Sequence, residues 1–158
     1  MTTLFRFMTV ADLDAVMALA HRSPGAPHWT RCIYQGAIEQ EQSAALVAIA
    51  GEALVGFVIA NLVLDICELE SIVVAPEFRR QKIGAALLDA IIVWSRQRSA
   101  QRIELEVRAR NMAAIALYER TGFLRQGIRR SYYSDPQEDA VLMALPLGIL
   151  PKTVEKNP

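Results

Sequence analysis

Hydrophobic and polar positions along the chain repeat with two different periods. Alternation with period two, or short apolar runs rich in Val, Ile and Leu, predicts strands over residues 4–8, 44–50, 53–64, 66–74, 102–107, 124–133 and 140–145. Apolar residues three and four apart predict helices over residues 9–20, 30–40, 84–97 and 111–120. The predicted order, β-α-α-β-β-β-α-β-α-β-β, is typical of a single mixed α+β domain.

Residues that favour helix ends and turns stand at several of these boundaries. Thr9 is followed three residues later by Asp12, a pattern that resembles a capping box. Asn111 suits the N-cap of the last helix and Gly122 its C-cap. Gly51-Glu52, between two apolar runs, has the Gly-X form of a type II′ hairpin turn.

Alternation also predicts which strand side chains share a face. In the strand over 66–74, one face is expected to carry Leu69, Ser71 and Val73, and the other Glu68, Glu70, Ile72 and Val74. In the strand over 102–107, Glu104 and Glu106 are expected on one face, opposite the apolar residues between and beside them.

Composition narrows the classes of protein that this chain can be. Of its 158 residues, 53% are hydrophobic and 22% charged, which excludes a disordered chain and is enough for one domain, expected over 1–146 with a loose tail over 147–158. Lys plus Arg equal Asp plus Glu at 17 each, so no direct nucleic-acid binding is expected. Polar residues interrupt the most apolar region, 44–64, so no membrane span is expected.

Cysteine and histidine usage points to a reducing compartment and to no metal. Cys32 and Cys67 form no CxxC pair, so a cytoplasmic location is expected. His28 and Cys32 could share a helix face, but no second ligand pair has the spacing of a metal site.

The segment over 72–84, IVVAPEFRRQKIG, predicts an anion site. A strand end is followed by a loop with Arg79, Arg80 and Lys82, and then by a helix start. Free N–H groups and the helix macrodipole favour negative charge at such a start, and a pyrophosphate would suit the loop. The alternative is a solvated basic turn that only leads into a helix.

The segment over 103–123, IELEVRARNMAAIALYERTGF, offers an acid and a base. Glu104 or Glu106 could serve as a general base at a strand end, and Tyr118 as a proton donor from the following helix. The alternatives are that these carboxylates only pair with Arg108 or Arg110 and that the tyrosine belongs to the core.

The segment over 129–140, RRSYYSDPQEDA, combines adjacent tyrosines with carboxylates across a proline turn. Aromatic walls beside carboxylates could hold an amine or a peptide N-terminus. The alternative is a hairpin with exposed charge.

Together these segments resemble the GNAT N-acetyltransferase superfamily over residues 4–145. The runs LEVRARNMAAIALYERTGF and IRRSYYSDPQEDAVLMALPL are similar to those of the RimI-type ribosomal-protein alanine N-acetyltransferases. The resemblance implies a central mixed, mostly antiparallel sheet in which two parallel strands splay apart to hold acetyl-CoA, flanked by helices. It also implies direct acetyl transfer to a protein N-terminal amine, here the alanine end of a small-subunit ribosomal protein.

The resemblance implies a role for each matching residue. Glu106 would be the base and Tyr118 the acid. Cofactor contacts would come from Ile72, Val73, Val74, Arg79, Arg80, Gln81, Lys82, Ile83, Gly84, Ala85 and Asn111. The peptide would lie in a narrow slot between Trp29 and the hairpin residues Tyr132, Tyr133, Glu138 and Asp139.

One residue departs from the family pattern. Lys82 stands where the family's phosphate loop usually has its first glycine, a residue that permits close backbone approach to a phosphate. Lysine keeps the N–H and adds a positive charge. Two alternatives stay open at this point: a GNAT enzyme that acts on a small amine, and a non-catalytic acyl-CoA-binding module.

Overall fold

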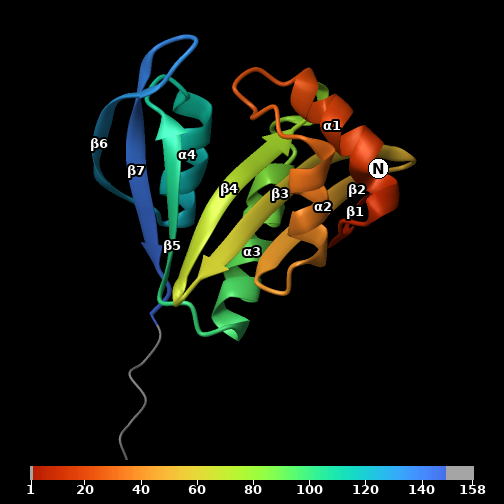
Figure 1. Cartoon of the computed structure of the whole chain (residues 1–158), viewed down its shortest axis with the longest axis horizontal. Coiled ribbons are helices and arrows are strands. Elements are labelled where there is room, and N and C mark those ends of the chain that lie inside the picture. Colours follow the sequence, from red (N-terminus) through yellow and green to blue (C-terminus); the bar gives the residue numbers. More distant parts are fainter. Residues whose placement is uncertain (1, 149–158) are drawn as a thin grey trace, which may run out of the picture.

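The computed structural model describes residues 2–148, which form one seven-stranded sheet with helices on both faces (Figure 1). The strands lie in the order β1-β2-β3-β4-β5-β7-β6. Their bounds are β1 Thr3–Phe7, β2 Ser43–Ala50, β3 Ala53–Val63, β4 Ile66–Val74, β5 Arg102–Arg108, β6 Leu124–Tyr133 and β7 Glu138–Pro146. The helices are α1 Leu13–His21, α2 Arg31–Glu39, α3 Ile83–Gln97 and α4 Met112–Thr121, with short 3-10 turns η1 Val10–Asp12 and η2 Pro76–Phe78.

The sheet divides between β4 and β5, its one parallel pair within residues 2–148. All other neighbouring strands run antiparallel. Figure 1 shows β4 and β5 side by side at one end and separated at the other, with α4 beside β5 to β7 and the remaining helices beside β1 to β4. The mixed α+β class and the splayed parallel pair expected from the sequence are therefore confirmed.

Each face of the sheet is covered by its own helices. The ring of Phe57 in β3 lies 6.0 Å from that of Tyr34 in α2, so this face carries α1 and α2. A Cβ atom built on the neighbouring Gly56 would meet Leu87 and Ile83 of α3, so α3 covers the opposite face. The core between these layers is apolar, and its largest buried side chains include Leu13, Leu19, Phe57, Ile59, Leu88, Ile91 and Ile103.

A β-bulge in β4 overturns the predicted alternation of that strand. Leu69 pairs with Ala60 and Ser71 with Ile59, so Glu70 is an extra residue between two consecutive partners. Glu68 lies opposite Asn61, and Val73 lies opposite Phe57. Because Asn61 and Phe57 are four residues apart on β3, Glu68 and Val73 share a face, and the prediction that they point to opposite faces was wrong.

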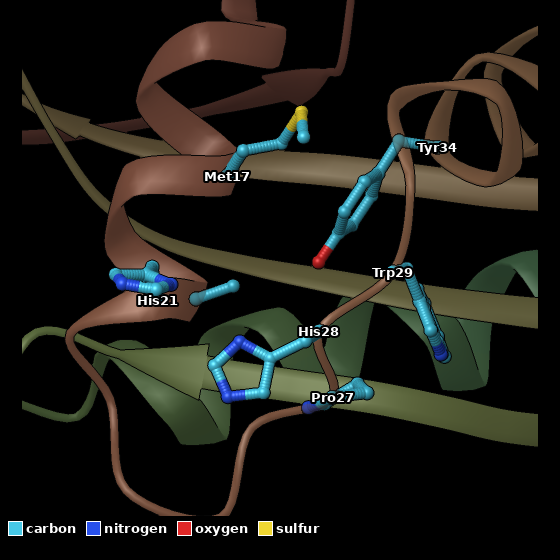
Figure 2. A pocket seen from close by; sticks show the side chains of 7 residues that line it. Met17, His21, Pro27, His28, Trp29 and Tyr34 are labelled. Carbon is cyan, nitrogen blue, oxygen red and sulfur yellow. The ribbon is translucent and has the colours of Figure 1, made fainter.

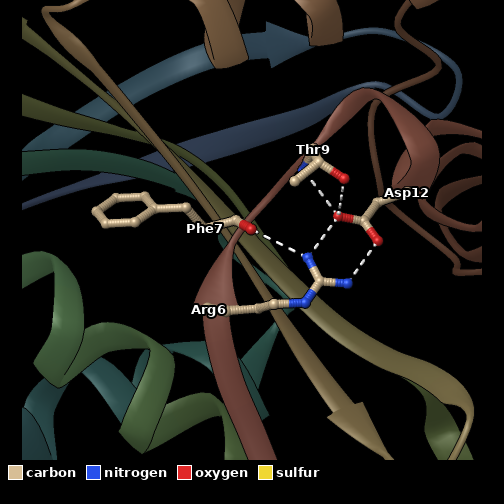
Figure 3. A network of polar contacts seen from close by, with 4 residues as sticks. All are labelled: Arg6, Phe7, Thr9 and Asp12. Carbon is tan, nitrogen blue, oxygen red and sulfur yellow. Dashed lines mark hydrogen bonds and ion pairs between the residues drawn. The ribbon is translucent and has the colours of Figure 1, made fainter.

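Local signals placed most element ends correctly. The Asp12 carboxylate accepts the Thr9 backbone N–H at 2.7 Å and also binds Arg6, which closes the turn before α1 (Figure 3). Asn111 Oδ1 accepts the Ala114 N–H at 3.2 Å, and Gly122 ends α4 with φ +112°. Each of these contacts is local, which is why the sequence alone could predict it.

The end of the predicted domain extends slightly further than expected. Leu147 is 4% exposed, and its N–H donates to the Gln101 carbonyl at 3.0 Å, so it belongs to the packed domain. The rest of the predicted tail, residues 149–158, lies outside the described residues. No helix within residues 2–148 is long and apolar enough to cross a membrane.

Candidate active site

The site begins where β4 leaves β5. Pairing between them covers only Ile66–Glu68 against Arg102–Glu104, and the bulge at Glu70 follows directly. Beyond it, Ile72, Val73 and Val74 pair with β3 on one side, while no described strand pairs with their other side. Backbone N–H and C=O groups on that open edge are therefore available to an extended ligand.

The basic loop after β4 leads into α3 through two left-handed residues. Arg80 has φ +62° and Lys82 φ +64°, and both are exposed. Lys82 is the N-cap of the 15-residue helix α3, whose first N–H groups receive no side-chain cap. No ion pair engages Arg79, Arg80 or Lys82 within residues 2–148. Free cations beside a helix start make this loop suitable for a polyanion.

Gly84 brings the start of α3 close to α4. A Cβ atom added there would lie 3.2 Å from Leu117 Cδ2 and 3.7 Å from Val74 Cγ2. A larger residue would push α3 away from β4 and α4, so this glycine shapes the loop through packing. The same contact places α4 on the α3 side of the sheet.

The two candidate bases differ in their partners. Glu104 accepts from Arg102 Nε at 2.6 Å within its own strand. Glu106 Oε1 lies 3.5 Å from Arg129 Nη1 of β6. Hydrogen bonding to the Glu106 carboxylate is also the largest influence that raises the pKa of Tyr132. The sequence alternative of pairing with Arg108 or Arg110 is therefore not what the structure has, because both carboxylates use other arginines.

Tyr118 is held inside the protein on α4. It is 5% exposed, and its ring lies 5.6 Å from that of Phe123. Burial raises the pKa of Tyr118, with Tyr133 as a second cause, so the hydroxyl keeps its proton at neutral pH. The phenol is thus both a core residue and a possible proton donor.

Glu106 and Tyr118 come from opposite faces of the sheet. Glu104 lies opposite Glu68 in the parallel register, so Glu106, two residues further along β5, faces the same side as Glu68. Tyr118 comes from α4, on the other side. A general base and a proton donor on opposite faces of a sheet can act on the two sides of one reacting centre.

The β6–β7 hairpin brings its two tyrosines together beside Glu106. Their rings are 5.0 Å apart, and the Arg108 guanidinium lies 4.4 Å from the centre of the Tyr133 ring. Burial, followed by the charge of Glu106, raises the pKa of Tyr133 to about 12. These rings form an aromatic wall next to the carboxylate.

The two hairpin carboxylates predicted to touch substrate have partners inside the protein. Glu138 accepts the Arg110 backbone N–H at 2.7 Å, and Asp139 accepts that of Ser131 at 2.8 Å. Both therefore brace the hairpin. Trp29 stands apart from this group, since its ring packs at 5.4 Å on Tyr34 of α2.

Sequence reasoning missed one contact of Glu106 and one feature of β4. Arg129 lies on the edge strand β6 and forms an ion pair with Glu106. The pairing register of β6 shifts on either side of Arg129, so alternation along the sequence could not predict this contact. Glu70 occupies the bulge. Glu70 is exposed to solvent. Its pKa is nevertheless raised, first by the protein atoms packed around its carboxylate and then by the charge of Glu68. Neither residue carried a local signal in the sequence.

Comparisons with known proteins agree with this geometry. Residues 12–123 match the sequence model of the acetyltransferase (GNAT) family. The chain is 38% identical over 144 residues to the ribosomal protein bS18-alanine N-acetyltransferase of Salmonella typhimurium, covering 90% of this chain and 96% of that relative. It superposes on the crystal structure of the ribosomal-protein-S18-alanine N-acetyltransferase from Escherichia coli with TM-score 0.86 and 34% identity, covering 97% and 99%. It also shares the fold of Arabidopsis thaliana NAA60 in complex with acetyl-CoA, with TM-score 0.84, 21% identity, and 92% and 98% covered.

Proposed function

Since the chain belongs to the GNAT family of acetyltransferases, we propose that it transfers the acetyl group of acetyl-CoA to a protein N-terminal amine. The acceptor proposed is the N-terminal alanine of a small-subunit ribosomal protein, in the cytoplasm. The observation that carries this proposal is the opening of β4 from β5 beside a basic helix start, in a chain 38% identical to a bS18-alanine N-acetyltransferase.

The residues present fit acetyl-CoA. The open edge at Ile72, Val73 and Val74 offers backbone groups to the amides of an extended pantetheine arm. Arg79 and Arg80, with the free N–H groups of Ile83, Gly84 and Ala85, suit a pyrophosphate. Gln81 belongs to the same loop, and Asn111 is proposed as a further cofactor contact, although its amide oxygen already accepts a hydrogen bond in the α4 cap.

Lys82 is compatible with this assignment. It holds the left-handed backbone that a glycine would adopt most easily, so its N–H keeps the same place in the loop. Its ammonium adds a charge next to the helix start. We infer that the loop binds a polyanion with lysine at this position.

Acetyl-CoA supplies an activated thioester when it is bound. We assign the proton from the acceptor ammonium to Glu106, directly or through a water molecule. The amine then forms the new bond to the acyl carbon, and a β4 N–H near Val74 stabilises the oxyanion. As the C–S bond breaks, Tyr118 donates its proton to the departing sulfur, and the nitrogen returns its second proton to the resulting phenolate. Burial raises the pKa of Tyr118, so the hydroxyl is protonated when this step begins.

The acceptor slot is proposed between the α1–α2 loop and the β6–β7 hairpin. Trp29 and the two tyrosines would form its walls, while Glu138 and Asp139 fix the hairpin that carries those tyrosines. A narrow slot admits an extended chain end and leaves little room for a branch point.

Two measurements test the proposal. Calorimetry is expected to show acetyl-CoA binding by the folded protein, and no heat at millimolar ligand would contradict it. A peptide panel that varies only the first residue is expected to favour alanine. A matched panel with a blocked N-terminus and a free lysine is expected to react far more slowly, and comparable rates would point to a side-chain acetyltransferase.

A further inference from the structure

A cavity lies under the α1–α2 loop, outside the groups assigned to catalysis. Its volume is about 130 Å³. Its walls are Met17 and His21 from α1, Pro27, His28 and Trp29 from the loop, and Tyr34 from α2 (Figure 2), together with Ala20 of α1. The proposed mechanism uses none of these residues except Trp29, which is also assigned to the acceptor slot.

The inner end of the cavity carries a polar atom without a partner. Tyr34 is 1% exposed, and within residues 2–148 its hydroxyl makes no hydrogen bond. In Figure 2 this hydroxyl points away from Met17 and toward the side of His21 and His28, into the space between the helix and the loop. Burial raises the pKa of Tyr34, so the hydroxyl is neutral and has a proton to donate. A buried donor without a partner costs stability, which makes it unusual unless something binds it.

The ring that carries this hydroxyl is fixed in place. It packs at 5.4 Å on Trp29 and at 6.0 Å, edge to face, on Phe57. The His21 and His28 rings stand 5.3 Å apart in an edge-to-face arrangement, and both residues are exposed, so they form the outer rim. The donor is thus held rigidly at the base of a pocket whose entrance is polar.

The lining decides what the pocket can accept. Met17, Ala20 and Trp29 are apolar, and no acidic side chain borders the cavity. An engineered apolar cavity of about 150 Å³ binds benzene, so this volume suits one aromatic ring or a branched aliphatic group. A cationic group would find no opposite charge inside, and an anionic group would meet only the two histidines of the outer rim, whereas one hydrogen-bond acceptor could meet the Tyr34 hydroxyl.

We propose that this cavity is a binding site for a compact, uncharged group about the size of one aromatic ring, with a single hydrogen-bond acceptor that meets the Tyr34 hydroxyl. Such a group could be a side chain of the acceptor peptide beyond its first residue, or a free small molecule. The first source rests on the proposed function, because Trp29 would separate this pocket from the acceptor slot. The pocket itself does not depend on that function.

Phenol binding tests the site without acetyl-CoA. Titration of the protein with phenol, followed by NMR, is expected to shift methyl and ring signals of Met17 and Trp29. Toluene has the same shape without the oxygen and is expected to bind at least 10-fold more weakly. In Tyr34→Phe this preference is expected to disappear. Cys32→Ser, an exposed change on the same helix that does not line the cavity, is expected to keep it.

Folding of the variant is a readout of its own. Phenylalanine keeps the ring contacts and removes only the unpartnered hydroxyl, so Tyr34→Phe is expected to melt at the same temperature as the natural protein or higher. A lower melting temperature would show that the hydroxyl has a structural partner, and this would overturn the proposal. Absence of phenol binding at 10 mM (roughly the limit for so small a ligand) would overturn it as well, and leave water as the occupant.

Peptides distinguish the two sources. Alanine-first peptides with Ala, Leu, Phe or Tyr at the second or third position are compared in the natural protein and in Tyr34→Phe. A lower KM for Tyr than for Phe that is lost in Tyr34→Phe, with kcat unchanged, assigns the site to the acceptor. Selective phenol binding with no such difference assigns it to a free molecule. If the natural protein acetylates none of these peptides, that result contradicts the proposed function. The phenol result does not depend on it.

Discussion

The Arg129 guanidinium of β6 lies 3.5 Å from the Glu106 carboxylate of β5, although these strands are not adjacent in the sheet. The contact therefore reaches across β7. The Glu106 carboxylate also raises the pKa of Tyr132, which lies on the same strand as Arg129. A carboxylate held by an ion pair loses less rotamer freedom when an amine arrives, which favours transfer of the proton.

Replacing Arg129 with glutamine is expected to lower kcat about 10- to 100-fold, because small misplacements of a reacting group have effects of that size. The affinity for acetyl-CoA is expected to stay the same. Arg130→Gln is the matched control, since its side chain is 85% exposed and lies 4.0 Å from Asp139. Equal effects of the two changes on kcat would mean that hairpin charge matters and that the contact with Glu106 does not.

Glu106→Gln is expected to lower turnover about 10²- to 10⁴-fold, the usual range for loss of a positioned base, with little change in acetyl-CoA affinity. Glu104→Gln is the comparison, because this carboxylate lies on the same face and pairs with Arg102. Steady-state kinetics and calorimetry measure the two quantities. If Glu104→Gln proved the more damaging change, the base would be the other carboxylate of β5.

Tyr118→Phe is expected to lower turnover while the fold survives. Phenylalanine keeps the packing on Phe123, at 5.6 Å between ring centres, and removes only the proton. Circular dichroism would check the fold and kinetics the rate. Turnover equal to that of the natural protein would leave Tyr118 as a core residue alone.

The fold was predictable where short-range signals determine it. Asn111 caps α4 through the residue three positions on, and Gly51 takes φ +63° in the turn between β2 and β3 as a Gly-X hairpin requires. Both depend on residues within a few positions. The same holds for the order of strands and helices, which follows from periodicity.

The site was only partly predictable, because its contacts depend on register. One inserted residue at Glu70 reverses which β4 side chains face α2, and alternation has no means to detect an insertion. Arg129 reaches Glu106 only after register shifts in β6. From the sequence, Tyr34 is an ordinary aromatic residue of an amphipathic helix. Only the packing of the α1–α2 loop shows that its hydroxyl has no hydrogen-bond partner among the described residues.

Lys82→Gly is expected to raise the free energy of unfolding by about 1 kcal/mol, since a left-handed backbone costs a non-glycine residue roughly 1–2 kcal/mol. Lys82 has φ +64°. Lys82→Ala is the control, because it removes the charge and keeps the Cβ atom. Both variants are expected to bind acetyl-CoA more weakly at low salt. Denaturant unfolding that ranks alanine equal to glycine would mean that the backbone at this position is not strained.

The Arg6–Asp12 pair is expected to make stability depend on pH in the acid range. Its bonds are 2.7 and 2.8 Å long, and hydrogen bonding from Arg6 is the first cause that lowers the pKa of Asp12 below its ordinary 3.8 (Figure 3). The resulting stabilisation is complete above the ordinary value and disappears as pH falls through the lowered one. Asp12→Asn is therefore expected to cost about 1–3 kcal/mol at pH 7. Denaturant unfolding at pH 7 and near pH 2 measures this cost. A cost that persisted undiminished in acid would mean that the carboxylate charge is not what stabilises the turn.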